Sequence, residues 1–116
     1  MDLHYNGRIF RGRSNTGNGD VGSETIFYYR QEGDVVSATY TGGVVRDGQL
    51  LGTVADDGSL DFCYHHIDSD GALHAGQCRS TPRVEKGGRL VLEEEWQWLT
   101  GDRSRGSSVV EEVEVP

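Results

Sequence analysis

A domain usually has about 100–150 residues, so the 116 residues of this chain predict one domain spanning 1–116. Its 11 basic and 19 acidic residues give a net charge of −8, which argues against nucleic acid and anionic membranes as partners. No apolar run approaches the roughly 20 residues of a membrane span, and the first residues show neither the basic start nor the apolar run expected of a signal peptide. Two cysteines fit reduced thiols, so we expect a cytoplasmic location.

The 17 glycines leave little room for helices, because glycine in a helix interior costs about 1 kcal/mol. The longest glycine-free stretches are residues 59–70 and 89–100. In the second stretch Leu92, Trp96 and Trp98 alternate with mostly polar neighbours. This period of two is typical of a β-strand with one buried face.

Five short segments ending in glycine separate strand-like runs, in chain order 31–33, 46–48, 56–58, 69–71 and 86–88. Glycine suits the left-handed third position of a three-residue hairpin loop. Five such hairpins join six antiparallel strands, and longer links at 15–22 and 101–106 add one strand at each end. The chain therefore predicts an all-β, eight-stranded antiparallel meander closed into an up-and-down barrel, since closure removes strand edges. An open sheet or a sandwich is the alternative.

Hairpin loops also determine which side chains share a face, because directly opposed residues point the same way. The predicted inward face collects Ile26, Tyr28, Val36, Ala38, Tyr40, Leu50, Gly52, Val54, Leu60, Phe62, Tyr64, His66, His74, Gly76, Cys78, Ser80, Leu92, Glu94, Trp96 and Trp98. The outward face collects Gln77, Arg79, Glu93, Glu95 and Gln97. Loops and polarity sort the residues consistently, which supports the register. A slip by one residue would expose Phe62 and Tyr64 and bury Cys63 instead.

Residues 17–22 match the dinucleotide fingerprint GxGxxG. That fingerprint binds pyrophosphate only where it opens a helix. The following residues, 23–30, are rich in Thr, Ile, Phe and Tyr and predict a strand. We therefore interpret 17–22 as a loop.

Two cysteines and two histidines on adjacent strands raise the question of a zinc site. The predicted register directs Cys63 and His65 outward but His74 and Cys78 inward, which separates the four ligands and also forbids a disulfide. A two- or four-residue hairpin loop would reverse both conclusions, on the zinc ligands and on the disulfide. We predict neither a metal nor a cofactor.

Glu94 is the most informative inward residue. A buried carboxylate must be paired, hydrogen-bonded or protonated. Glu94 could form a hydrogen bond with Ser80 or an ion pair with an arginine of the first strand, Arg8 or Arg11. Alternatively, it orients a ligand among the aromatic rings. His66 is predicted to meet His74 at the rim, where it could carry protons, contact a ligand or form a polar cluster.

Several segments together resemble a family of small bacterial proteins often labelled n-acetylglutamate synthase. They occur in the order Ser14–Gly19, Ser23–Thr25, Tyr64–His66, Gly76–Cys78, Ser80–Pro82, Glu94–Trp98 and Gly101–Asp102. The label implies acetyl transfer. The sequence does not support that activity, since it has no room for a coenzyme-binding helix and its charge repels coenzyme A and glutamate.

Three hypotheses follow. In the first, a barrel of lipocalin-like or avidin-like shape binds a small aromatic or apolar ligand. The predicted ligand-binding residues are Tyr28, Tyr40, Tyr64, His66, Glu94, Trp96 and Trp98. In the second, the protein is an enzyme with Glu94 or His66 as general acid or base, although no catalytic residue is assigned. In the third, it is a structural protein that forms a homodimer through its outer face.

Overall fold

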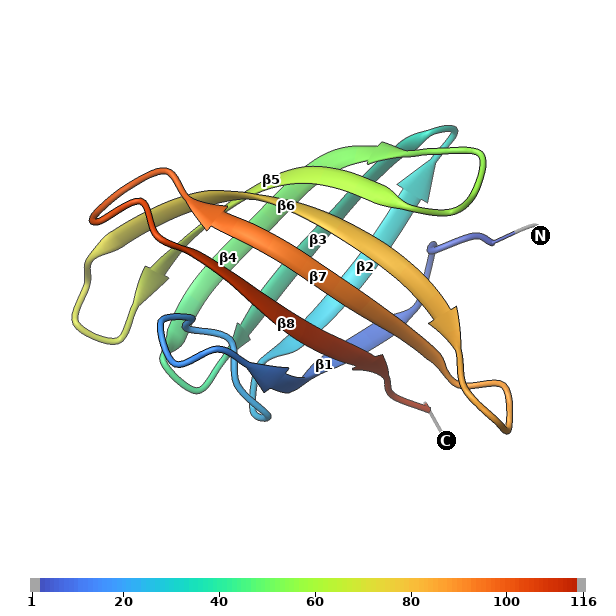
Figure 1. Cartoon of the computed structure of the whole chain (residues 1–116), viewed down its shortest axis with the longest axis horizontal. Coiled ribbons are helices and arrows are strands. Elements are labelled where there is room, and N and C mark those ends of the chain that lie inside the picture. Colours follow the sequence, from blue (N-terminus) through green and yellow to red (C-terminus); the bar gives the residue numbers. More distant parts are fainter. Residues whose placement is uncertain (1–2, 115–116) are drawn as a thin grey trace.

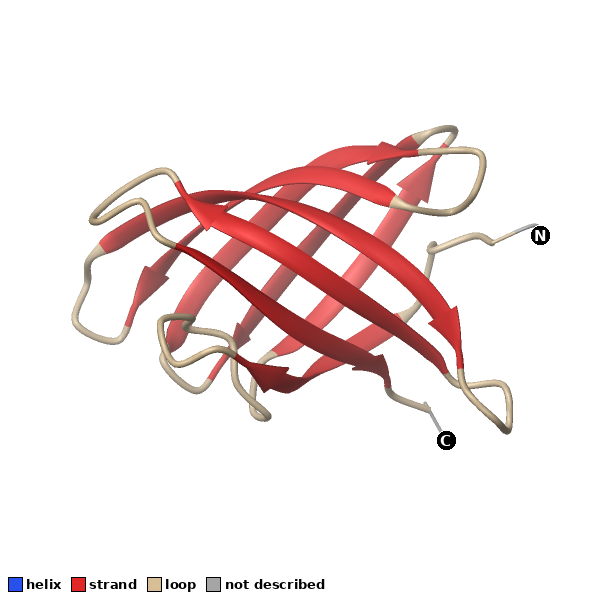
Figure 2. Ribbon diagram, viewed as in Figure 1, coloured by secondary structure: helices blue, strands red, loops and turns tan. Residues whose placement is uncertain are grey.

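Every regular element of the described residues, 3–114 of the computed structural model, is a β-strand (Figures 1 and 2). The strands are β1 (Ile9–Asn15), β2 (Ile26–Glu32), β3 (Val35–Gly42), β4 (Val45–Val54), β5 (Leu60–Asp68), β6 (Leu73–Val84), β7 (Leu90–Trp98) and β8 (Arg105–Glu112). Each strand pairs with its sequence neighbours and β1 pairs with β8, which closes the barrel. The predicted eight-stranded meander is confirmed, and the open sheet is wrong. Within this range there is no helix that could cross a membrane.

The two ends of the barrel differ. One end, which we call the mouth, carries the connections after β1, β3, β5 and β7 (left in Figure 1). At the other end the segment before β1 tucks inside, and Tyr5 is fully buried with its hydroxyl donating to the carbonyl oxygen of Gly58. The far end is therefore plugged by the chain itself, a feature that the alternation of strand residues did not reveal.

The register from β4 to β7 is confirmed. Leu60 lies opposite both Val54 and Ser80, and Trp98 lies opposite Gly76, as the loops 56–58, 69–71 and 86–88 predict. The glycines that end these loops have φ values of 84–90°, in the left-handed region. Phe62 and His66 are buried and Tyr64 is half-buried, whereas Cys63 and His65 are exposed.

The predicted direction of β2 is wrong, because its side chains point to the opposite faces from those expected. The turn is Gly33–Asp34, so that Glu32 pairs with Val35 rather than lying in a loop at 31–33. Phe27 and Tyr29 consequently point inward, while Tyr28 is 50% exposed and Ile26 shares its outward face. Residues 27–29 are three aromatics in a row, so period-two polarity cannot set their direction. The observed register buries two rings instead of one, each worth roughly 2–3 kcal/mol.

The predicted loop 46–48 is also wrong, because these residues belong to β4. The turn lies at Gly43–Val44, and a bulge between Val45 and Asp47 absorbs the difference. Leu50 still points inward, as predicted, because the observed and predicted registers of β4 differ by an even number of residues. Tyr40 now lies opposite Gly48 rather than Val54, and its ring covers the bare glycine backbone.

Candidate ligand-binding site

The mouth half of the barrel interior contains a small cavity of about 40 Å³. Six of the seven predicted ligand-binding residues line it: Tyr40, Tyr64, His66, Glu94, Trp96 and Trp98. The seventh, Tyr28, lies on the outer face and is a wrong prediction of direction. The alternation of β3, β5 and β7 therefore brings together residues that are far apart in the sequence.

Aromatic rings form most of the wall. Trp96 and Trp98 contact each other with ring centroids 5.4 Å apart, and Tyr64 meets Trp98 edge-on at 5.7 Å. Phe27 stacks on Tyr40 with ring centroids 4.9 Å apart. The sequence prediction missed this contact because it directed Phe27 outward. The rings are packed at the distances typical of protein cores, so this part of the wall is closely packed and apolar.

Glu94 is the buried acid of this interior, with 8% of its surface exposed. Its carboxylate accepts hydrogen bonds from the hydroxyls of Ser80 and Ser108, each at 3.2 Å. The predicted hydrogen bond with Ser80 is confirmed. The predicted arginine alternative is wrong, because Arg8 pairs with Glu112 and Arg11 pairs with Glu111. Burial without a cation raises the pKa of Glu94 to about 7, against the lowering effect of the two hydroxyls.

At the mouth, His66 is held between two partners. Its Nδ1 lies 2.9 Å from the hydroxyl of Tyr40, and its Nε2 lies 2.8 Å from Oδ2 of Asp20. His74 stands across the strand pair with ring centroids 5.6 Å apart, as predicted, and its Nε2 lies 2.7 Å from Oδ2 of Asp68. The rim thus carries two histidine–carboxylate pairs, each joined by a hydrogen bond.

The connection between β1 and β2, residues 16–25, covers the mouth. The indole N–H of Trp98 donates to the carbonyl oxygen of Asn18, and the Asn18 amide donates to the carbonyl oxygen of Arg105. Asp20 adds the contact with His66. The glycine-rich motif at 17–22 is therefore a loop before a strand, as predicted, and it closes the barrel.

Sequence reasoning missed the polar residues Asn15, Asp20 and Ser108, which line the same cavity. Ser108 follows from the Glu94 register once β8 is placed opposite β7. Asn15 donates through its amide to the carbonyl oxygen of Val21, while its Oδ1 is buried with no hydrogen-bond partner among residues 3–114. No sequence pattern could place Asp20, because its loop has no period.

The cysteines face opposite sides of the barrel wall. Cys63 is exposed and Cys78 is buried, which confirms their predicted directions and keeps the zinc ligand set considered above apart. Burial raises the pKa of the Cys78 thiol far above its usual value, so this group stays protonated.

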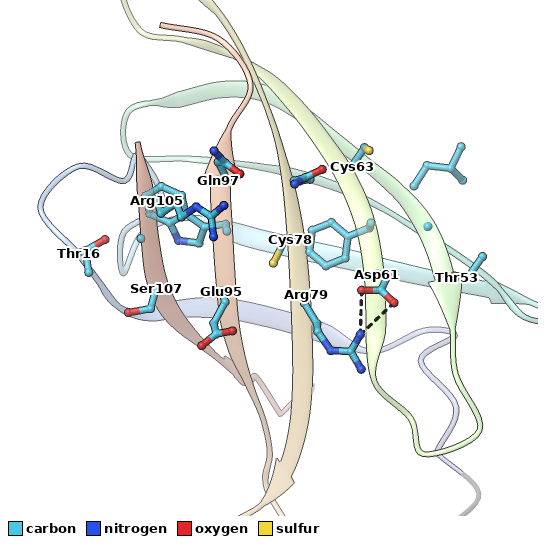
Figure 3. Close-up of a pocket in the computed structure, with 16 residues that line it drawn as sticks. Thr16, Thr53, Asp61, Cys63, Cys78, Arg79, Glu95, Gln97, Arg105 and Ser107 are labelled. Carbon is cyan, nitrogen blue, oxygen red and sulfur yellow. Dashed lines mark hydrogen bonds and ion pairs between the residues drawn. The ribbon is translucent and has the colours of Figure 1, made fainter. Parts of the chain in front are cut away.

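A larger hollow, of about 970 Å³, lies on the outside of β4–β8 (Figure 3). Outward polar side chains line most of it, among them Asp61, Arg79 and Glu95, and Asp61 pairs with Arg79 at 3.4 Å. These groups already face water. The hollow offers none of the buried polar atoms that mark the interior as a site.

One of three comparisons with known proteins returned a match, and it agrees with this architecture. Neither the search of curated proteins nor that of solved structures returned a match. A family model described as avidin-like protein matches residues 3–113, which is almost the whole chain. Barrels of this kind are associated with small-ligand binding. An eight-stranded closed meander matched over this length shows that the chain belongs to the avidin-like protein family.

Proposed function

We propose that the protein binds a small molecule with an aromatic or apolar body and a hydrogen-bond donor group. The body would pack against Trp96, Trp98, Tyr40 and Tyr64, and the donor group would face Glu94. A few polar groups in an apolar wall are how ligand pockets fix orientation. The membership of the avidin-like family supports this class of function.

The single observation that carries the proposal is the burial of the Glu94 carboxylate in the barrel interior. This carboxylate is buried among aromatic rings, and within residues 3–114 its hydrogen-bond partners are two hydroxyls at 3.2 Å. Burying it costs free energy that a purely structural core would save with an apolar side chain. The unpartnered acceptor Oδ1 of Asn15 lines the same cavity. Two acceptors in one place favour a ligand with N–H or O–H donors.

The cavity must enlarge to take such a ligand, since about 40 Å³ holds little more than one water molecule. Ligand pockets usually have about 300–1,000 Å³. Residues 16–25 are the segment whose displacement would open it, because they lie over the mouth, and the hydrogen bonds of Asn18 with Trp98 and of Asp20 with His66 would have to break. We therefore expect binding to be slow compared with a pre-opened pocket.

Tryptophan fluorescence and thermal shift with indole, benzamide and biotin as probes test the proposal. A bound probe should lose affinity in Glu94→Gln by about ten- to hundredfold, the value of a hydrogen bond to a charged group. Trp96→Phe should also weaken binding. The matched control is Glu95→Gln, which removes an outward carboxylate from the same strand. Equal affinity in all four proteins, including the wild type, would show that the pocket is misplaced.

The raised pKa of Glu94 also favours a second candidate, an enzyme that uses this group as general acid or base. NMR titration of the carboxyl carbon discriminates the two. A pKa of Glu94 near the ordinary value of 4.5 would leave the enzyme hypothesis without support. A homodimer through the outer face stays a further proposal, tested by light scattering. The n-acetylglutamate synthase label carries no residue role over to this chain.

A further inference from the structure

We propose that the mouth of the barrel holds a divalent transition-metal ion of the Zn²⁺ type, bound by His66, His74, Asp20 and Asp68. This site is separate from the proposed small-ligand function and does not rest on it. It also differs from the cysteine–histidine set that the sequence suggested, with which it shares only His74.

Two parts of the chain that are remote in the sequence converge at this point. Asp20 lies on the loop between β1 and β2, whereas Asp68, the last residue of β5, and His74, the second residue of β6, belong to one hairpin. One ligand atom from each of these three residues lies within 4.8 Å of the other two. His66 joins them through its Nε2, which is 2.8 Å from Oδ2 of Asp20.

These distances are close to those of a metal site. Zinc binds nitrogen and oxygen at about 2.0–2.2 Å, which places tetrahedral ligands roughly 3.5 Å apart. The ligand atoms of Asp20, Asp68 and His74 would have to draw together by about 1 Å, and Nε2 of His66, which lies outside that group of three, would have to move further. Asp20 can supply that movement, because Gly19 and Gly22 flank it in a loop of no regular structure.

The donor atoms are already oriented by neighbours, as metal ligands usually are. The hydroxyl of Tyr40 lies 2.9 Å from Nδ1 of His66, which leaves Nε2 as the nitrogen that contacts Asp20. The other carboxylate oxygen of Asp68, Oδ1, accepts backbone N–H bonds from Asp70 and Ala72 at 2.9 Å, which leaves Oδ2 as the oxygen that contacts His74.

The charge also fits. Two carboxylates and two neutral imidazoles sum to −2, which a divalent ion neutralises. The ion pairs of Asp20 and Asp68 within residues 3–114 involve only the two histidines, and no arginine competes for them. Imidazole with carboxylate is a ligand set for zinc and its neighbours rather than for Ca²⁺ or Mg²⁺.

The same geometry could also be explained without a metal, by two ordinary hydrogen bonds, one between His66 and Asp20 and one between His74 and Asp68. The metal account differs in requiring all four residues to act together. A bound ion would join the loop to β5 and β6 and would fix the cover of the barrel in place.

The test uses ZnCl₂ and CoCl₂ with tag-free protein. Zinc should raise the melting temperature and bind at one ion per chain in calorimetry. Cobalt should give visible absorption bands and should quench Trp98, whose ring centroid lies 5.7 Å from that of His66 and 5.6 Å from that of His74. The variant Trp96→Phe makes Trp98 the sole tryptophan for this measurement.

Asp20→Asn and His74→Gln should each weaken zinc binding by about tenfold or more. The matched controls are Asp70→Asn in the same turn and His65→Gln on the outer face of β5, which should bind like the wild type. Circular dichroism verifies that every variant is folded. The proposal is overturned if the wild type binds no zinc, or if either Asp20→Asn or His74→Gln keeps wild-type affinity.

Discussion

Replacing Glu94 by glutamine should make the protein more stable at alkaline pH and change little at acidic pH. The ordinary pKa of a glutamate side chain is 4.5, and burial raises the pKa of Glu94 to about 7 in the folded state. The folded protein therefore holds this proton more tightly than the unfolded chain. The favourable contribution of the protonated group is complete below pH 4.5 and is lost as the pH rises through 7.

The magnitude follows from the two pKa values. They differ by about 2.5, and each pKa unit corresponds to about 1.4 kcal/mol, so ionising Glu94 in the folded state costs about 3 kcal/mol. Glutamine keeps the shape of the protonated acid and cannot ionise. Relative to the wild type, Glu94→Gln should gain about 3 kcal/mol in free energy of unfolding between pH 4.5 and pH 8.

Urea unfolding followed by tryptophan fluorescence at pH 4.5 and pH 8 measures this gain. Comparing the two proteins at each pH cancels the other titrating groups, such as Asp68, whose pKa is lowered mainly by its hydrogen bond with His74. Glu95→Gln is the control, since an exposed side chain should change stability by less than about 0.5 kcal/mol. A stability difference between Glu94→Gln and the wild type that is the same at both pH values refutes the reasoning.

Three further predictions test the fold. Cys63 should react with a small maleimide in the native protein while Cys78 should not, and the opposite pattern in peptide mapping would overturn the register of β5 and β6. Gly52→Ala places a methyl group against the backbone of β5 and should cost about 1–3 kcal/mol or more, whereas Gly17→Ala meets open space and should be nearly neutral; equal melting temperatures would contradict this. Tyr5→Phe removes the hydroxyl that binds Gly58 and should cost about 1–2 kcal/mol in urea unfolding, and an unchanged midpoint would show that the plug is not held there.

The strands from β4 to β7 could be predicted because two signals agree there. Gly58, Gly71 and Gly88 end their loops in the left-handed conformation, and the alternation of apolar and polar residues fits those loops alone. The inward direction of Glu94 followed from the same agreement. Its pairing with Ser80 followed too, because directly opposed residues share a face.

The sequence was ambiguous where either signal was weak. Phe27, Tyr28 and Tyr29 are all aromatic, so polarity could not decide which of them face inward, and Gly33 fits the first position of a two-residue turn as well as the last of a longer loop. Asp20 and Tyr5 lie in segments without period. Their places depend on contacts made only after the barrel closes, and these are the residues that cover the mouth and plug the far end.

The central claim is that a small molecule binds inside the mouth, between the tryptophans and Glu94. The most direct measurement is ¹H–¹⁵N NMR during titration with the probe, among indole, benzamide and biotin, that raises the melting temperature most. The indole N–H resonances of Trp96 and Trp98 should shift and saturate together, because the ligand contacts both rings and displaces Asn18 from Trp98. Shifts confined to outward groups such as the Gln97 amide, with both indole signals unmoved, would contradict the account.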